Sequence, residues 1–529
     1  MQKYLKKIFF VILLLLIAFK AFSVEFKIST YNVENLFDLN YDGREYSEFI
    51  PDTGFRWDNE TYNKKIKNIT KVICDIDADI LALQEIESEK ALKDLISNTR
   101  KTCKNYPYFA IAIDNEKIPV RCALLSTFPI VDKKDIKIDG DFRDILKATL
   151  NIYGNKLIIY INHWKSKSHP ESYRLVSAKA LLKDIRKLKN GIDYIITGDF
   201  NENYNEYKTS RFIKRLEDTK GITGINHILR TYVSGGLVDK SLVLSSNNKG
   251  YHYNLWLEAK SKDRFSYMFA GKYETPDSII IPETLFDKKG INYRDNSFYV
   301  FKPPYLYSDK EINRWKRAKS GNAWHVGDGY SDHLPLVATF TTEPFIESKL
   351  PVITRQVTAE DLYKTDKLDE YYLIRDVVVI QKVGFNALIK QIDNRAIYCY
   401  RCLDNFQISD KFDLIVNELK DFKGLREIVD AKILKRKGKF NNIEKLFIDC
   451  KNLKDFKNNV NEVCKQLEGV YKNGFLHHNN QKIKLYFADK KIKLKNNTTI
   501  SLKGVRIGYS REPEIVVENK NQIFTRGDI

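Results

Sequence analysis

Five short stretches of the chain carry carboxylates, amides and imidazoles, side chains that bind divalent cations and transfer protons. In chain order they are TYNVENLFD (30–38), LQE (83–85), NHWKSK (162–167), GDFN (198–201) and SDHLP (331–335). Hydrolysis of a phosphate ester needs a cation to offset the phosphate charge, a base to activate water and an acid to protonate the leaving oxygen. Each stretch alone is typical of an ordinary turn, but together they supply side chains for all three tasks.

Oxygen atoms are the main metal-binding groups in these stretches, and none of the five contains a cysteine. The candidate metal ligands are Asn32, Glu85 and Asp332. Hard oxygen ligands favour Mg²⁺ or Mn²⁺ over Zn²⁺. We therefore expect Mg²⁺ (or Mn²⁺) as the cofactor, with Ca²⁺ as a candidate structural ion.

Most of these stretches lie at the ends of short apolar runs that are typical of strands. The runs cover residues 26–33, 79–85, 122–126, 156–163, 193–201 and 334–340. Amphipathic patterns over 60–76 and 172–189 predict helices among them. The alternation predicts an α/β domain over residues 24–342, whose sheets present functional side chains from strand ends.

In this order and at strand ends, the five stretches resemble the endonuclease/exonuclease/phosphatase superfamily. Its members include DNase I-like nucleases, abasic-site endonucleases, sphingomyelinases and inositol-polyphosphate phosphatases. The resemblance covers about residues 25–342. It implies a four-layer α/β sandwich of the DNase I-like kind and the hydrolysis of phosphate esters.

The resemblance also implies roles for single residues. Glu85 would be the principal metal ligand, with Asn32 beside it as a ligand or a holder of water. Asp199 and Asn201 would orient the attacking water and bind a phosphate oxygen, and Asp332 would help to hold the metal.

Two histidines complete the implied site. His333 would contact the phosphate or transfer a proton, and His163 is the candidate general acid. The segment FSYMFAGKYETPDSIII (265–281) resembles the one in which an Asp supports the last histidine, which makes Asp277 the candidate. Ser278 departs from the His or Tyr more usual after this Asp, and the sequence shows no convincing carboxylate partner for His163.

Further phosphate contacts are expected from Arg121, Lys165, Ser166 and Lys167. For Arg121 and Lys165, an ordinary solvated charge is an equally good interpretation.

The first 23 residues have the layout of a secretory signal peptide. Three lysines precede an apolar run of twelve residues, and Ala21-Phe22-Ser23 is a small-x-small cleavage site. The run is shorter than the roughly 20 residues of a spanning helix, although an uncleaved anchor is the alternative. We expect a secreted or periplasmic protein with no stable membrane insertion after cleavage.

The remainder of the chain is predicted to be rich in strands. TTEPFIESKLPV, with its two prolines, predicts a linker over residues 343–352. Short strand patterns then predict a β-rich domain that loosely resembles an OB-fold (353–445) and a second, basic β-rich domain (446–529).

The positive charge is concentrated at the end of the chain. The whole sequence carries a formal charge of +19, and residues 431–529 hold 22 Lys and Arg against 10 Asp and Glu. A basic β module with aromatic residues is typical of a surface for single-stranded nucleic acid. A solvated, lysine-rich domain that uses those aromatics in its core is an equally good interpretation.

These observations favour an exported, metal-dependent nuclease that acts on DNA, with RNA as a further candidate substrate, and whose basic C-terminal region aids binding. The alternatives are a sphingomyelinase-like phospholipase or a phosphatase of small phosphate esters in the same superfamily, and a non-catalytic binding protein of the same fold. Endo or exo action, metal number and oligomeric state have no sequence signal.

Cysteine usage is sparse for an exported chain, with seven in all. Cys399 and Cys402 form a Cys-x-x-Cys pair, for which a local disulfide or two packed thiols is favoured over a redox pair or half a zinc site. The odd count predicts at least one free thiol unless it pairs between chains.

Overall fold

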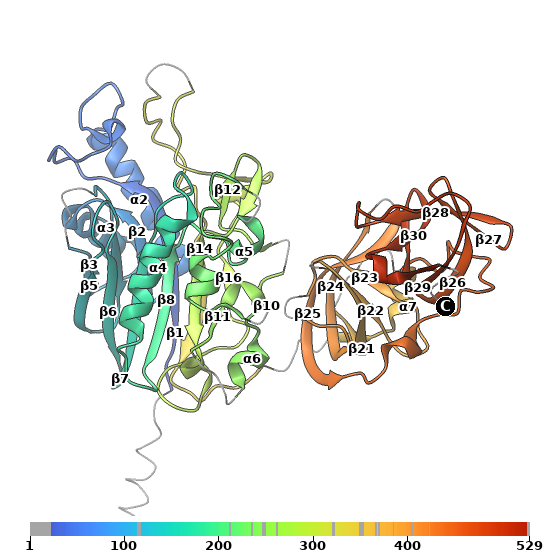
Figure 1. The fold of residues 1–529 in the computed structure, drawn as a ribbon. Helices are drawn as coiled ribbons and strands as arrows, with labels where there is room; N and C mark the ends of the chain where they lie inside the picture. The colour runs from blue at the N-terminus through green and yellow to red at the C-terminus, as the bar shows by residue number, and fades with distance from the viewer. Residues whose placement is uncertain are drawn as a thin grey trace, which may run out of the picture. The chain divides into compact units, whose positions relative to one another are not determined.

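The computed structural model describes most of the chain after the predicted signal peptide, which lies outside the described residues except for Ser23. The described ranges are 23–113, 118–210, 213–233, 236–245, 250–260, 263–319, 323–348, 354–365, 368, 371–384, 386–403, 406–422 and 424–525. The chain divides into two compact units, Met1–Val233 with Val238–Ser348, and Ser234–Leu237 with Lys349–Ile529. Figure 1 shows the elements of both units.

The N-terminal unit contains two mixed sheets. In the first, β1 runs parallel to β2 and antiparallel to β19. The strand order is β15 (Asn292–Tyr293), β19 (Leu336–Thr341), β1 (Glu25–Leu36), β2 (Ile80–Ile86), β4 (Arg121–Ser126) and β3 (Tyr108–Ile111), with β16 (Tyr299–Val300) also paired to β19.

In the second sheet, β7 runs parallel to β8, and the other neighbours are antiparallel. The order is β11 (His252–Asn254), β14 (Asp277–Pro282), β8 (Asp193–Asp199), β7 (Asn155–His163), β6 (Ile145–Ile152) and β5 (Ile130–Ile136). Two short hairpins accompany the sheets: β12 (Tyr267–Phe269) with β13 (Lys272–Glu274), and β17 (Tyr307–Ser308) with β18 (Glu311–Ile312). β9 (Tyr232–Val233) pairs with β10 (Gly236–Leu237).

Alternation along β7 shows how the layers are built. Ile159 and Ile161 belong to the core shared with the first sheet, whereas Ile158 and Tyr160 belong to a separate core under α4 (Glu171–Ile185). Because successive strand residues point to opposite faces, the second sheet lies between the first sheet and this helix. The first sheet is covered by α2 (Asn59–Ile76) and α3 (Glu89–Thr102), which gives the predicted four-layer α/β sandwich.

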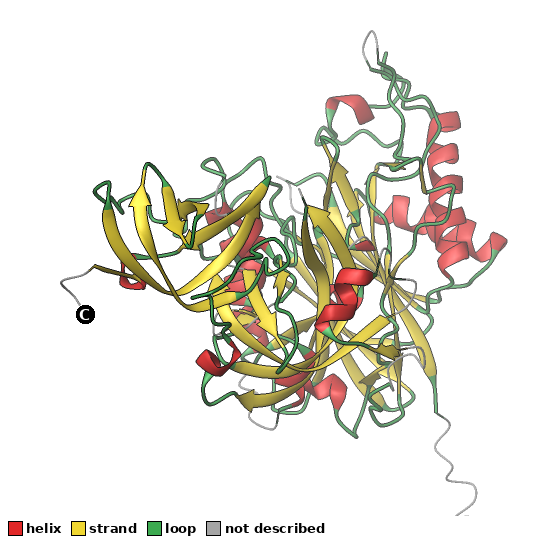
Figure 2. Cartoon of the chain, turned by 90° about the vertical axis from the view of Figure 1, so that its right-hand side faces the viewer, coloured by secondary structure: helices red, strands yellow, loops and turns green. Residues whose placement is uncertain are grey.

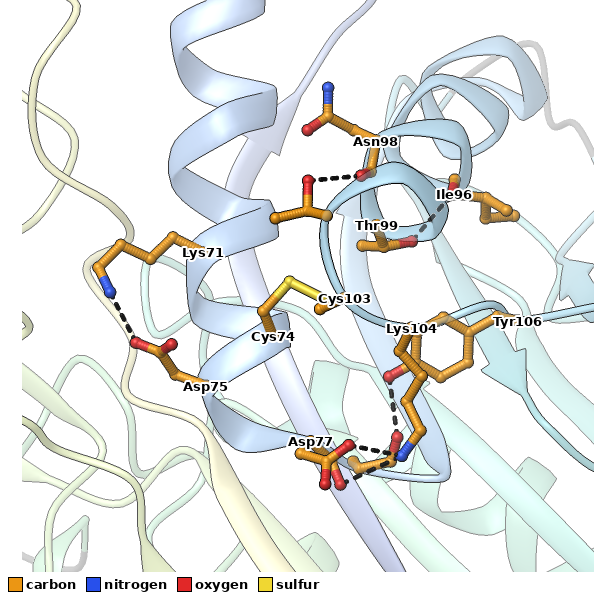
Figure 3. The surroundings of a disulfide bond; sticks show 12 residues. Lys71, Cys74, Asp75, Asp77, Ile96, Asn98, Thr99, Cys103, Lys104 and Tyr106 are labelled. Carbon is orange, nitrogen blue, oxygen red and sulfur yellow. Dashed lines mark hydrogen bonds and ion pairs between the residues drawn. A yellow bond between two sulfur atoms is a disulfide. The ribbon is translucent and has the colours of Figure 1, made fainter.

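Capping residues define where the two long helices of the first layer begin. The Asp58 side chain accepts a hydrogen bond from Thr61 N at the start of α2, and Ser88 does the same from Ala91 N at the start of α3. A disulfide from Cys74 in α2 to Cys103 after α3 joins their C-terminal ends (Figure 3). The other helices of this unit are short: α5 (Glu206–Thr209), α6 (Lys240–Leu244), the 3₁₀ turns Ser47–Phe49, Leu255–Glu258 and Glu283–Phe286, and the π-turn Gly224–Ile228.

The C-terminal unit contains two closed barrels and few helices (Figure 2). In the first barrel, β21 pairs with both β22 and β24, and β23 runs parallel to β25, so the order is β21-β22-β23-β25-β24-β21. Its elements are β20 (Thr354–Gln356), α7 (Ala359–Lys364), β21 (Tyr371–Val383), β22 (Asn386–Lys390), β23 (Ile397–Cys399), β24 (Asp410–Phe422) and β25 (Leu425–Lys439).

The second barrel repeats this order. β26 pairs with both β27 and β29, and β28 runs parallel to β30. The strands are β26 (Val463–Lys472), β27 (Phe475–His478), β28 (Gln481–Phe487), β29 (Thr498–Ser510), β30 (Glu512–Val517) and β31 (Ile523–Thr525). Closed five-stranded barrels of this kind are OB-fold-like, as the sequence predicts.

The two barrels share a hydrophobic core, whose residues lie on both sides of the predicted domain boundary at 445/446. Val378 and Leu388 of the first barrel belong to the same buried cluster as Leu467 and Leu502 of the second. The boundary falls inside the 3₁₀ turn Ile443–Leu446, whose Leu446 is buried in that cluster. The predicted linker (343–352) spans the end of the N-terminal unit at Ser348, and its last four residues are outside the described ranges.

Three disulfides occur among the described residues: Cys74–Cys103, Cys399–Cys402 and Cys450–Cys464. Cys122 is the free thiol, and it is buried. The Cys-x-x-Cys pair is thus a local disulfide. Within the described ranges, no helix is both long and apolar enough to cross a membrane.

Candidate active site

Three neighbouring strands of the second sheet bring His163, Asp199 and Asp277 to one level. His163 at the end of β7 lies opposite Asp199 at the end of β8, and Asp277 at the start of β14 lies opposite Asp199 on the other side. Gly198 makes the pairing of β7 and β8 possible, because a Cβ there would lie 2.1 Å from the carbonyl oxygen of Asn162. Its φ of +126° is also a conformation that favours glycine.

The first sheet supplies Asn32 and Glu85 from β1 and β2. The Asn32 amide nitrogen donates hydrogen bonds to Glu85 Oε1 at 3.0 Å and to Asp199 Oδ2 at 3.1 Å. His163 Nε2 lies 3.6 Å from each of these two carboxylate oxygens. Asn32 therefore joins the two sheets at the site.

The amide orientation of Asn32 bears on its predicted role. Its side-chain oxygen accepts a hydrogen bond from the backbone N–H of Glu34 at 3.0 Å, while its nitrogen faces the two acids. In this orientation Asn32 positions Glu85 and Asp199, and the metal-ligand role stays a prediction.

Several residues here have left-handed backbone conformations. Glu85 has φ +68° and Asn201 has φ +52°. Such conformations are uncommon outside glycine and concentrate at functional sites. In the GDFN turn, Asn201 N donates to Asp199 Oδ1 at 2.8 Å, and the Asn201 amide nitrogen donates to the Trp164 carbonyl at 3.1 Å.

His333 is held by a carboxylate. Its Nδ1 lies 2.7 Å from Asp277 Oδ2, and Ser266 Oγ donates to the same oxygen at 2.6 Å. The other ring nitrogen, Nε2, lies 3.9 Å from Asp332 Oδ1 and 4.0 Å from Asp199 Oδ2. Asp277 thus orients His333, and three carboxylates surround the imidazole.

The two imidazoles have opposite preferences for a proton. Burial and then the positive charge of Arg143 hold the pKa of His163 well below its usual value. Burial also opposes protonation of His333, but Asp277, Asp332 and Asp199 together raise its pKa well above the usual value. At neutral pH the His163 imidazole is therefore neutral and the His333 imidazole is protonated.

Buried acids at the site fit a divalent cation. Burial is the main reason that the pKa of Asp199 is raised to about 7, and repulsion from Asp277 and Glu85 adds to it. Burial and the charge of Glu85 likewise raise the pKa of Asp332. Ligand atoms of Asp199, Asp277 and His333 lie within 4.8 Å of one another. Oxygen donors that repel one another are the environment that a hard cation stabilises.

Comparison with known families gives one decisive match. A model described as the endonuclease/exonuclease/phosphatase family matches residues 27–237. These residues, which are less than half of the chain, are similar to that family. Divalent-metal-dependent hydrolysis of phosphate esters is the chemistry of that superfamily, and Asp199, Asp277 and His333 form a cluster that could hold a metal ion.

Solved structures similar to this chain include three from different sources. Humanized TDP2 of D. rerio is 12% identical (TM-score 0.37) over 60% of this chain and 98% of that chain. A family protein from Bacteroides thetaiotaomicron is 14% identical (TM-score 0.37) over 61% and 99%, and the human Nocturnin catalytic domain is 15% identical (TM-score 0.36) over 60% and 96%. Comparison with curated proteins gives no match.

The N-terminal unit also contains charged residues that the motifs did not reveal. Arg314 donates to Glu34 Oε1 and lies 3.3 Å from Asp332 Oδ2. Lys65, fully buried, donates to the Tyr330 carbonyl at 3.0 Å, and burial lowers its pKa to about 8. Glu34 lies two residues after Asn32 in the first motif, whereas Lys65 and Arg314 lie far from any motif in the sequence.

The four predicted phosphate contacts have different environments. The Arg121 guanidinium donates to the Glu87 carbonyl, and Lys167 lies 3.1 Å from Glu206 and 3.2 Å from Glu274. Ser166 Oγ lies 2.6 Å from Ser168 Oγ. The Lys165 ammonium lies 5.6 Å from the Phe142 ring centroid, and burial followed by the charge of Arg143 lowers its pKa. Arg121 and Lys167 are therefore engaged within the protein.

Proposed function

We propose that the protein is an exported, divalent-metal-dependent nuclease that hydrolyses phosphodiester bonds of DNA, with RNA as a further candidate substrate. The observation that carries this proposal is the Asn32 amide nitrogen between Glu85 and Asp199, beside two imidazoles of opposite proton preference. An acid, a base and a cluster of carboxylates are the parts that phosphodiester hydrolysis needs.

Glu85, Asp199 and Asp332 would hold the cation, which when bound would offset the charge of the phosphate. Neutral His163 lies 3.6 Å from Asp199 and is placed to accept a proton from a water that Asp199 and Asn201 orient. His333, protonated and fixed by Asp277, is placed to contact the phosphate and to protonate the leaving oxygen. This assigns the acid role to His333, whereas the sequence analysis named His163 as the candidate general acid.

A polynucleotide substrate is supported by the outer face of the second barrel. On β27 and β28, Phe475 lies opposite Lys484, and His477 lies opposite Lys482. The Lys482 ammonium lies 4.0 Å from the Phe475 ring centroid, and Lys490 lies 4.5 Å from that of Tyr486. Aromatic platforms with adjacent cations can hold single-stranded bases and phosphates.

Export is supported by the signal-like N-terminus and by the disulfides. Disulfides form and persist mainly outside the cytosol, and three of them join six of the seven cysteines of the sequence. Detection of the mature N-terminus near Val24 in a periplasmic or culture-medium fraction would test this part.

A substrate panel tests the activity. Supercoiled plasmid, single-stranded DNA, RNA, sphingomyelin and a phosphate monoester are each incubated with Mg²⁺ or EDTA. The proposal expects DNA cleavage with Mg²⁺ and none with EDTA. Cleavage of sphingomyelin or the monoester in preference to DNA would favour the alternative phospholipase or phosphatase, and no turnover of any substrate would favour a binding protein.

Substitutions on the outer face of the second barrel test its role in binding. Truncation is unsuitable, because a cut at residue 431 would divide β25 and a cut at 446 would open the core that the two barrels share. Lys482→Gln with Lys490→Gln should weaken binding of single-stranded DNA and reduce its salt slope by about 1 to 2. Tyr153→Ala, an exposed tyrosine of the other unit, is the control. An unchanged slope would contradict a role for this face.

A further inference from the structure

Arg143 lies beside the candidate site on the segment between β5 and β6. Its Nη1 lies 3.5 Å from the Trp164 carbonyl oxygen, which also accepts a hydrogen bond from the Asn201 amide at 3.1 Å. Trp164 follows His163 directly, and Asn201 closes the GDFN turn. The guanidinium is therefore anchored to the same peptide group as two of the predicted site motifs.

Tyr46 is a second neighbour of Arg143. The Tyr46 hydroxyl has a pKa raised by burial, and it experiences both the positive charge of Arg143, to which it hydrogen-bonds, and the negative charge of Glu85. Arg143 is also the first charge after burial to affect His163. These relationships place the guanidinium within the electrostatic reach of both the proposed metal ligand and the proposed base.

Three other cations at the site have anionic partners. Arg314 pairs with Glu34 and Asp332, His333 with Asp277, and Lys167 with two glutamates. Among the described residues, no carboxylate oxygen lies within 4.0 Å of Arg143. The Arg143 Nε atom is buried, and no described residue provides a hydrogen-bond acceptor for it.

A buried donor without an acceptor is costly, and a contact of 3.5 Å to a neutral carbonyl offsets little of that cost. A guanidinium presents parallel N–H donors that match the oxygens of a phosphate. An anionic ligand would satisfy this group at the place where the proposed substrate must bring its phosphate.

We propose that Arg143 binds non-bridging oxygens of the substrate phosphate, with Lys165 as a second cation at the same edge. This proposal rests on the proposed function for its substrate class, a phosphodiester. Arg143 thereby fills the role that the sequence analysis gave to Arg121 and Lys167, whose charged groups are engaged elsewhere.

Phosphate binding by the full-length protein tests this inference without requiring catalysis. Inorganic phosphate is titrated by calorimetry in the presence of Mg²⁺ against the native protein, Arg143→Gln and Arg143→Lys. Arg294→Gln, an exposed arginine near Glu25, is the control. We expect phosphate affinity to fall about 10- to 100-fold in Arg143→Gln, because hydrogen bonds to charged groups are lost. Arg143→Lys, which keeps the charge without the planar fork, should lose less.

Thermal unfolding of each variant separates binding from structure. A purely structural anchor would lower the melting temperature of Arg143→Gln and leave phosphate affinity unchanged, and that result would overturn the proposal. If Arg143→Gln does not fold, Arg143→Lys decides, since native-like phosphate affinity there would also overturn it. Absence of phosphate binding by the native protein would also overturn the proposal.

The bis(p-nitrophenyl) phosphate assay keeps the two proposals distinguishable. With Mg²⁺, Arg143→Gln should raise KM more than it lowers kcat. Loss of phosphate binding in this variant, together with no hydrolysis by native protein, would support Arg143 while contradicting the nuclease. Hydrolysis by native protein, with an unchanged KM in Arg143→Gln, would support the nuclease while contradicting the role of Arg143.

Discussion

Asp277 Oδ2 lies 2.7 Å from His333 Nδ1, and this pair joins two segments that are 56 residues apart in the sequence. Ser266 Oγ and the strand pairing of Asp277 with Asp199 fix the carboxylate from two sides. The hydrogen bond sets the ring orientation of His333 and directs its Nε2 toward Asp199 and Asp332. The geometry of the candidate site thus depends on one carboxylate–imidazole contact.

Asp277→Asn is expected to lower kcat by about 100-fold or more, the usual contribution of a positioned acid or base. The folded-state pKa of His333 is raised by its acidic partners, so removing one lowers it, and the imidazolium is lost at a lower pH. The alkaline limb of the kcat–pH profile should therefore move toward acid pH. Ser266→Ala, which keeps the carboxylate, should show a smaller loss, and an unmoved alkaline limb in Asp277→Asn would count against His333 as the acid.

Asp193 gives the stability of the N-terminal unit a pH dependence that does not involve the site. Burial, and to a smaller extent Asp287, raises its pKa to about 7, and its Oδ2 accepts a hydrogen bond from Ile291 N at 2.8 Å. The unfolded chain ionises this group near pH 4, so its stabilising contribution falls as pH rises from about 4 to about 7.

Asp193→Asn should remove that loss. Relative to the native protein, the free energy of unfolding of the variant should rise between pH 4 and pH 7 by up to about 4 kcal/mol and remain level above pH 7. Urea denaturation at a series of pH values measures the difference. A difference that does not vary with pH would show that Asp193 is not the group responsible.

The disulfide between Cys74 and Cys103 closes a loop with a sequence separation of 29. By the loop-entropy relation, the double variant Cys74→Ser/Cys103→Ser should lose about 3.5 kcal/mol of unfolding free energy. Denaturation of the N-terminal unit, followed by tryptophan fluorescence, measures the loss. Cys399→Ser/Cys402→Ser, in the other unit, should leave this transition in place, and equal effects of the two double variants would contradict the assignment.

The sheets of the N-terminal unit could be predicted because their strands are apolar runs that end in recognisable motifs. Runs at 26–33, 156–163 and 193–201 correspond to β1, β7 and β8, and the patterns at 60–76 and 172–189 correspond to α2 and α4. The strand register that places His163 opposite Asp199 could not be predicted from an apolar run. It depends on the close approach of β7 and β8 at Gly198.

Residues outside the motifs could not be predicted. Arg143 and Arg314 stand in segments with no periodic pattern, and Arg314 reaches Glu34 across 280 positions. The side-chain orientation of Asn32 depends on a backbone donor two residues away. In the C-terminal unit, strand content was visible in the sequence, whereas closure of each barrel depends on pairings such as β21 with β24.

The rates of Mg²⁺-dependent plasmid cleavage by native protein and by Glu85→Gln show whether the protein is a metal-dependent nuclease that uses this site. The substitution removes a charge beside Asn32 and His163 but keeps the shape of the side chain. We expect cleavage by native protein that EDTA abolishes, with Glu85→Gln slower by at least about 100-fold at saturating DNA. Cleavage that persists in EDTA, or a Glu85→Gln rate equal to that of native protein, would contradict it.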